Sequence, residues 1–208
     1  MLTAKRWFEL WQRLGVARRA DATLAGEFET LTTRYAEPHR HYHTAQHIAE
    51  CLTSFDGARE LCEQPAEVEL ALWFHDAIYE PRAKDNEAQS AIWAVRVMRE
   101  AGIASDACER VHALIMTTRH NALPMTPDEQ VLVDIDLSIL GADAVRFDQY
   151  EQQVQAEYGW VPQFLFNRTR KKILQGFLAR PSIYSTRHFS HQLEKRAREN
   201  LARSLSKL

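Results

Sequence analysis

The segment 126–141 reads TPDEQVLVDIDLSILG, and it decides whether the chain contains a buried strand. The stretch 131–140 is short and strongly apolar, which by itself fits a strand in the core. Both ends nevertheless carry helix signals. Thr126-Pro127-Asp128-Glu129 is a capping box with proline in the first turn, and Gly141 suits the position after a helix. We therefore predict a buried helix here and an all-α fold.

Outside this segment, apolar residues recur at helical spacing, and no stretch alternates as a strand does. Seven glycines and seven prolines in 208 residues also favour long helices over turn-rich β structure. In the helix expected after Asp85, we predict that Asp85 is the cap, that Ile92, Val95 and Met98 face inward, and that Gly102 ends it. About nine to ten helices are expected, roughly 7–14, 24–35, 44–61, 65–75, 85–101, 105–115, 127–140, 143–158, 162–179 and 187–205.

The length predicts one domain over 1–208, with a core at about 20–160 and helices 162–205 packed on it. Lys and Arg (26) nearly balance Asp and Glu (28), which argues against a dedicated nucleic-acid binder. Residues 168–208 are nevertheless basic, with eleven Lys or Arg and two Glu. No run approaches the roughly 18 apolar residues of a membrane span, and the N-terminal residues resemble no secretory signal. Together with three widely spaced cysteines, expected to be reduced and mostly packing residues, this predicts a cytoplasmic protein.

Three places put charged or polar side chains where helices should be apolar. His75-Asp76 lies inside WFHDAIY (73–79), and Asp134 and Asp136 lie inside VDIDL. Four histidines fall between 39 and 47, of which His43 and His47 share a helical face. An unpaired buried aspartate is costly, so these carboxylates are expected to be hydrogen-bonded, neutralised or metal-bound. Neighbouring residues on a helix point about 100° apart, which suits two adjacent ligands of one ion.

Imidazole and carboxylate together suit a divalent transition metal, namely Mn, Fe, Co, Ni or Zn, better than Ca or Mg alone, and Mg is kept as an alternative. Such a metal lowers the pKa of its bound water and polarises a phosphoryl group. The open alternative for His75-Asp76 is a buried hydrogen bond with a structural role.

The order His47, His75-Asp76, Asp136 resembles the HD superfamily of metal-dependent phosphohydrolases, an all-helical fold named for its His-Asp pair. Within this superfamily, the chain is similar to a bacterial branch known mainly as predicted HD phosphohydrolases. The resemblance implies that His47, His75, Asp76 and Asp136 hold the metal, with Asp134 as the alternative to Asp136. The similar segments span nearly the whole chain: 37–43 running on to His47, 74–79, 85–87, 117–120, 134–141, Arg168, 183–184 and the region of Asn200.

Other polar residues around these motifs are candidates for catalysis or substrate binding. Arg40 could clamp phosphate, because a guanidinium binds phosphate through two hydrogen bonds. Glu87 could act as a general base, although it also fits the acidic first turn of a helix. His120 could act in catalysis by offsetting charge on the phosphoryl group, or simply meet a helix end. The remaining candidates are His43 for catalysis, and His112 and Arg168 for substrate binding.

These expectations combine into a metal-dependent hydrolase of a phosphate ester, such as a nucleotide or a small phosphorylated metabolite. Two alternatives stay open: a non-catalytic HD-type module that senses a nucleotide or metal, and a di-iron oxygenase with the same ligands. A small phosphorylated substrate is the expected partner, with no nucleic acid and no membrane span. A homodimer is left open.

Overall fold

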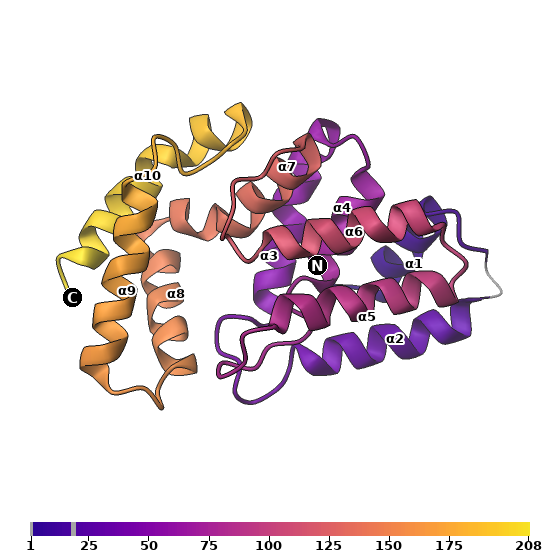
Figure 1. Ribbon diagram of the computed structural model, residues 1–208, viewed down its shortest axis with the longest axis horizontal. Helices are drawn as coiled ribbons and strands as arrows, with labels where there is room; N and C mark the ends of the chain where they lie inside the picture. The colour runs from indigo at the N-terminus through magenta and orange to yellow at the C-terminus, as the bar shows by residue number, and fades with distance from the viewer. Residues whose placement is uncertain (1, 18–19) are drawn as a thin grey trace. The chain divides into compact units, whose positions relative to one another are not determined.

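The computed structural model describes residues 2–17 and 20–208, which form ten α-helices, two short 3-10 helices and no strand (Figure 1). The all-α prediction is confirmed. The chain divides into two compact units, Met1–Val133 and Asp134–Leu208. The prediction of a single domain with its core at 20–160 stays a prediction.

The first unit builds its core from aromatic side chains. The ring of Trp7 packs edge-on against Trp11 and Trp73, with centroids 5.4 and 5.3 Å away, and its Nε1 donates to the carbonyl of Leu24 at 2.8 Å. The Tyr35 hydroxyl donates to the carbonyl of Trp73 at 2.8 Å. These contacts join the first, second and fourth helices. The elements are α1 (Ala4–Arg13), α2 (Asp21–Arg34), α3 (Ala45–Ala58), η2 (Arg59–Leu61), α4 (Pro65–Phe74), α5 (Asn86–Glu100), α6 (Ser105–Thr117) and the start of α7 (Pro127–Asp136).

The deciding segment is a helix, as predicted. The side chain of Thr126 accepts from the backbone N–H of Glu129 at 3.2 Å, and the Glu129 carboxylate accepts from the N–H of Thr126 at 3.0 Å. This is the reciprocal capping box. From Val131 to Ile135 every side chain is buried, so the apolar composition reflects a buried helix.

Asp85 occupies the N-cap position of α5, as predicted, but its side chain makes no capping hydrogen bond to the helix. Met98 is buried as predicted, whereas the prediction that Ile92 faces inward is wrong. Ile92 is 57% exposed, whereas the inward face is formed by Ser90, Ala91, Ala94, Val97 and Met98. Gly102 has a φ of +85°, as expected for a residue that ends a helix.

The second unit packs its last helix against the turn that follows α7. Its elements are η3 (Leu137–Gly141), α8 (Ala144–Glu157), α9 (Gln163–Leu178) and α10 (Arg187–Leu205). A Cβ on Gly141 would lie 2.6 Å from the Cβ of Leu193. Gly141 is therefore explained by this close approach, not by a left-handed turn. Asn200 donates to the carbonyls of Leu140 and Ala142 at 2.9 Å.

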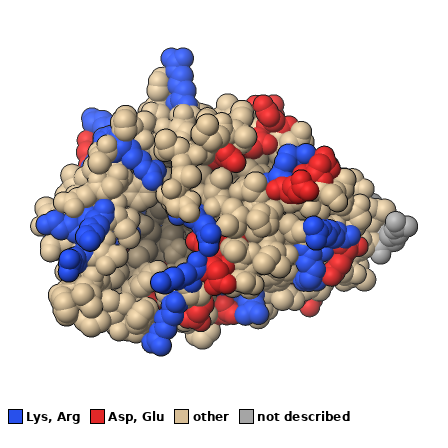
Figure 2. Space-filling view, in the orientation of Figure 1, with Lys and Arg blue, Asp and Glu red and all other residues tan. Residues whose placement is uncertain are grey.

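Lys and Arg side chains predominate over α9 and α10 on the face drawn in Figure 2. One of them, Arg170, is buried and donates to the hydroxyl of Tyr150 at 2.9 Å and to the carboxylate of Glu151. Among the described residues, no helix combines the length and apolar character that crossing a membrane requires.

Candidate metal centre

Two buried histidines, one in a helix and the other directly after a different helix, face each other in the first unit. His47 lies in the first turn of α3, which begins where the side chain of Thr44 accepts from the N–H of Gln46. His75 directly follows α4, whose residues 67–74 are all buried. The Nε2 atoms of His47 and His75 lie 3.1 Å apart. Residues separated by 28 positions in the chain thus place ring nitrogens in contact.

The carboxylate of Asp76 lies beside both rings. Its Oδ2 is 3.1 Å from Nε2 of His75 and 3.4 Å from Nε2 of His47. Burial opposes ionisation of this group, but the neighbouring His75 and His43 and the hydrogen bonds from His47 and His75 outweigh it. They hold the pKa of Asp76 well below its ordinary value. The carboxylate is therefore an anionic donor at neutral pH.

The ring of His75 is held in one orientation by the backbone. Its Nδ1 lies 3.0 Å from the carbonyl oxygen of Leu72. A carbonyl can only accept, so Nδ1 carries a proton, and Nε2 is the nitrogen that faces His47 and Asp76 and would present its lone pair to a bound metal. A hydrogen bond of this kind on the distal ring nitrogen is the usual support for a metal-binding histidine.

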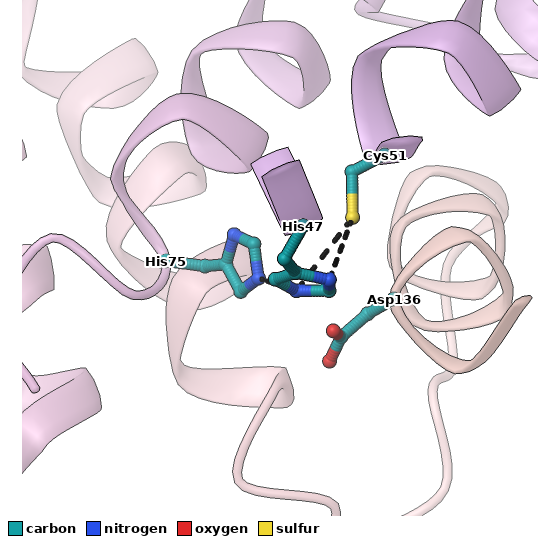
Figure 3. Close-up of side chains that lie close together, drawn as sticks. All are labelled: His47, Cys51, His75 and Asp136. Atoms are coloured by element: carbon teal, nitrogen blue, oxygen red, sulfur yellow. Dashed lines mark hydrogen bonds between the residues drawn. The ribbon is translucent and has the colours of Figure 1, made fainter. Parts of the chain in front are cut away.

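Cys51 and Asp136 complete the group (Figure 3). One ligand atom from each of His47, Cys51, His75 and Asp136 lies within 4.8 Å of the others. Cys51 is one turn after His47 on α3, and its Sγ is 3.7 Å from both ring nitrogens of His47. Asp136 is the last residue of α7, a continuous helix that begins in the first unit.

These separations match the edges of a coordination polyhedron. Metal–nitrogen and metal–oxygen bonds of about 2.1 Å place neighbouring ligands about 3.0–3.4 Å apart, and a metal–sulfur bond of about 2.3 Å lengthens a nitrogen–sulfur edge to about 3.6 Å. The observed values are 3.1, 3.1 and 3.4 Å among His47, His75 and Asp76, and 3.7 Å from Cys51 to His47. The donors present could therefore hold a metal ion.

The carboxylate of Asp134 accepts its hydrogen bonds from residues of the second unit. Its Oδ1 accepts from the N–H of Ser185, and its Oδ2 accepts from the N–H and hydroxyl of Thr186, each at 2.7 Å. Thr186 is in turn the N-cap of α10. Both oxygens of Asp134 are thus engaged at the start of that helix. The choice of Asp136 over Asp134 as the metal ligand stays a prediction.

Arg40 supports the loop and the turn that carry the candidate ligands. Its buried guanidinium donates to the carbonyls of His43, Asp76 and Ala77 at 3.1, 2.6 and 2.9 Å, and to the carboxylate of Glu37 at 3.0 Å. Four of the five N–H donors are used in this way. The structure thus gives Arg40 a positioning role, and the phosphate-clamp role stays a prediction.

Three other predicted site residues, His43, Glu87 and His120, have contacts or positions outside this group. The ring of His43 stacks on Tyr79 with centroids 4.0 Å apart, and lies 6.1 Å from the ring of His47. Glu87 faces Arg119 at 3.6 Å. His120 is partly buried after α6, with a φ of 53°.

His112 and Arg168 stand apart from the others. His112 is exposed on α6, and Arg168 is exposed on α9 of the second unit. No contact found among the described residues joins either side chain to the His47, His75 and Asp76 group. Their substrate-binding roles stay predictions.

Cys51 is the one member of the group that the sequence reasoning missed. The signal was its i, i+4 spacing from His47, which places two soft-metal donors on one helical face.

The chain was compared with protein-family models, with curated proteins and with solved structures, and none of the three comparisons found a match.

Proposed function

We propose that this protein is a metal-dependent hydrolase of a phosphate ester, with a nucleotide or another small phosphorylated metabolite as its substrate. One observation carries the proposal: two imidazole nitrogens and a carboxylate oxygen, from His47, His75 and Asp76, lie within 3.4 Å of one another. These are three of the four metal ligands that the HD resemblance implies. The fourth, Asp136, has a carboxylate oxygen within 4.8 Å of the ligand atoms of His47 and His75. The type of metal, the hydrolysis and the substrate class are proposals.

A divalent transition metal bound here would supply an activated water and a Lewis acid for a phosphoryl oxygen. The protein's own residues orient the donor groups and set their charge. The Leu72 carbonyl keeps the proton of His75 on Nδ1, so that Nε2 remains a donor of electrons. Asp76 contributes negative charge, and Arg40 holds the backbone carbonyl of Asp76. Cys51 adds a thiol, which favours Zn, Fe or Co over Mg.

On the substrate side, we place His43 at the phosphoryl group. Its ring is fixed by stacking on Tyr79 and lies next to that of His47, where an imidazolium would offset the charge that develops during phosphoryl transfer. His120 is proposed to assist it, and Glu87 is proposed as the base that orients the water.

Metal analysis of purified protein tests the site. Wild type is expected to carry stoichiometric metal, Asp76→Ala and His47→Ala to lose most of it, and the surface variant His191→Ala to keep it. Cobalt substitution adds a second readout, because a sulfur-to-cobalt charge-transfer band that disappears in Cys51→Ser identifies the thiol as a ligand. Stoichiometric metal that survives unchanged in both Asp76→Ala and His47→Ala would contradict the site.

A phosphatase screen with added Mn²⁺, Co²⁺ or Ni²⁺ tests the activity. We expect release of phosphate from at least one class of nucleotide or sugar phosphate, and its loss in Asp76→Ala. A nucleotide that raises the melting temperature without being turned over with any metal would favour a sensor module instead. Two bound irons with a visible charge-transfer colour after aerobic purification would favour the oxygenase.

A further inference from the structure

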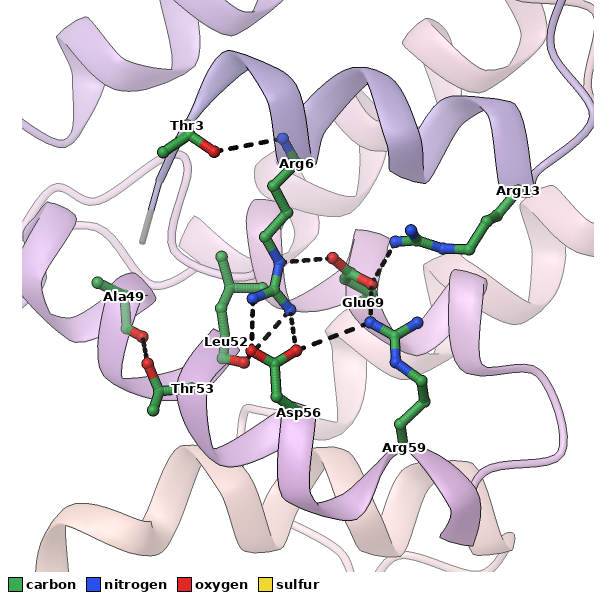
Figure 4. Close-up of polar contacts among 9 residues, drawn as sticks. All are labelled: Thr3, Arg6, Arg13, Ala49, Leu52, Thr53, Asp56, Arg59 and Glu69. Carbon is green, nitrogen blue, oxygen red and sulfur yellow. Dashed lines mark hydrogen bonds and ion pairs between the residues drawn. The ribbon is translucent and has the colours of Figure 1, made fainter.

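A second polar cluster in the first unit lies at the far end of α3 from His47 (Figure 4). Three arginines from two elements converge on the fully buried carboxylate of Glu69 in α4. Arg6 reaches its Oε1 at 2.8 Å, while Arg13 and Arg59 reach its Oε2 at 2.6 and 2.9 Å. Asp56 in α3 and His47 are nine residues apart, or about 14 Å along the helix. The cluster is therefore distinct from the candidate metal centre.

The three arginines are not equivalent. Arg6 hydrogen-bonds mainly to groups within the protein. Besides Glu69, it donates through both terminal nitrogens to Asp56 at 2.8 Å, and to the carbonyl of Leu52 at 3.3 Å. Among the described residues, Arg13 and Arg59 each make one hydrogen bond, to Glu69, and Arg59 also forms an ion pair with Asp56 at 3.7 Å. Their side chains are 38% and 29% exposed. They therefore retain N–H donors directed away from Glu69.

Contacts within the protein hold the side chains of Arg13 and Arg59 in place before any ligand binds. Both donate to the same carboxylate oxygen, which brings two like charges close together. The guanidinium of Arg59 also lies over the ring of Phe55, 4.7 Å from its centroid. Two adjacent guanidiniums held in this way match the paired N–H groups that recognise phosphate oxygens, and an anion in front of them would reduce their mutual repulsion.

A surface hollow of about 290 Å³ opens at these side chains. That volume lies at the lower limit of ordinary ligand sites, which suits a small ligand. Its lining includes the cations Lys5, Arg6, Arg13 and Arg59 and the carboxylates Glu9, Asp56 and Glu69. One positive charge is thus in excess. Of the two carboxylates that Arg6 engages, Glu69 is fully buried, whereas Asp56 is 54% exposed.

We propose that this hollow binds a small oxyanion of the phosphate type, either free phosphate or the phosphoryl group of a metabolite. Arg13 and Arg59 donate to the oxyanion, Lys5 adds charge at the rim, and Glu69 with Asp56 holds the arginines in place. The proposal is independent of the proposed hydrolase activity, because none of the candidate metal ligands takes part.

Calorimetric titration of inorganic phosphate into metal-free protein tests the proposal. We expect saturable binding to wild type, and binding about ten- to hundredfold weaker in Arg13→Gln and in Arg59→Gln, because each loses charge-assisted hydrogen bonds. Arg110→Gln is the matched control. Arg110 is similarly exposed and pairs with Glu67 and Asp106 on the same unit, so its removal should leave phosphate affinity unchanged.

Two further experiments identify the site at which the anion binds and the class of anion that the site accepts. Binding must persist in Asp76→Ala, since phosphate bound at the candidate metal centre would be lost there. Each glutamine variant lacks the side-chain Nε–H NMR signal of the arginine that it replaces, which assigns that signal. In the wild type, we expect phosphate to shift the two signals assigned in this way. Sulfate and a nucleoside monophosphate, titrated in parallel, distinguish a site for any free oxyanion from one that requires a phosphorylated metabolite.

Three results would overturn the proposal: no saturable binding of any of these anions, equal weakening by chloride of matched ionic strength, or unchanged affinity in both glutamine variants. Thermal melts show whether each variant is folded. Should Arg59→Gln fail to fold, Arg59→Lys keeps the charge without the paired donors, and it is expected to weaken phosphate binding as well.

Discussion

The Nε2 atoms of His47 and His75 lie 3.1 Å apart, and the other nitrogen of His75 is held by the carbonyl of Leu72. The two Nε2 atoms can therefore share either a proton or a cation. With the anionic Asp76 against both rings, a divalent cation satisfies all three groups at once.

Removing the second imidazole should consequently empty the centre. We expect His75→Ala to lower the affinity for Zn²⁺ or Co²⁺ by about 100-fold or more, because it removes a donor and leaves Asp76 without its nearest partner. Competition with a chromophoric chelator measures the affinity. His191→Ala, on the exposed face of α10, provides the control. Equal affinities in the two variants would contradict the assignment of His75.

Arg40 offers a test of positioning without loss of a ligand. Arg40→Lys keeps the charge but cannot reach the carbonyls of His43, Asp76 and Ala77 together with one planar group. We expect metal affinity to fall about 10- to 100-fold, as for other supports of metal ligands, while the helical circular dichroism is retained. A phosphate clamp would behave differently: it would leave metal affinity intact and raise only the KM of the phosphorylated substrate.

The helical fold was predictable because its signals are local. The capping box at 126–129 and the repeated apolar spacing each need only a few neighbouring residues to be read. His75 and Asp76 could be singled out for a similar reason, since a charged pair inside an apolar run is costly unless it has partners.

The remaining parts of the site depend on contacts between distant segments. Cys51 lies in an apolar stripe, where a cysteine ordinarily packs, and only the fold brings His75 beside its neighbour His47. Arg40 belongs to a polar loop that suggests solvent exposure, yet the loop folds over the turn after α4 and buries the guanidinium. No spacing within the loop records that contact.

Gly141 shows how a local signal can suggest the wrong cause. A Cβ at this position would lie 2.6 Å from the Cβ and 3.0 Å from the carbonyl oxygen of Leu193 in α10. We expect Gly141→Ala to lower the free energy of unfolding by about 1–3 kcal/mol through overpacking. Gly176→Ala is the matched control in α9, where nothing lies within 4 Å, and it should be neutral or stabilise by up to about 1 kcal/mol. Urea unfolding measures both, and equal effects would contradict the close-approach explanation.

Cys62, at the end of η2, gives a prediction about pH. Burial, together with the carboxylate of Asp128, raises the pKa of the Cys62 thiol from 9.0 to about 12. At pH 8 its thiolate fraction is then about one in ten thousand, against about one in ten for an ordinary thiol with a pKa of 9.0. Because the thiolate is the nucleophile, alkylation of Cys62 in the native protein should be about 100-fold or more slower than in the urea-unfolded chain.

The pH profile distinguishes this cause from simple steric protection. Between pH 8 and 10, the native rate should rise about tenfold per pH unit, since the thiol stays far below its pKa, whereas the rate in the unfolded chain should level off above about 9. Iodoacetamide labelling followed by peptide mass spectrometry resolves Cys62 from Cys51 and Cys108. A native rate that levels off near pH 9 would show that Asp128 and burial leave the thiol unperturbed. A rate that is low and independent of pH would show that access alone protects it.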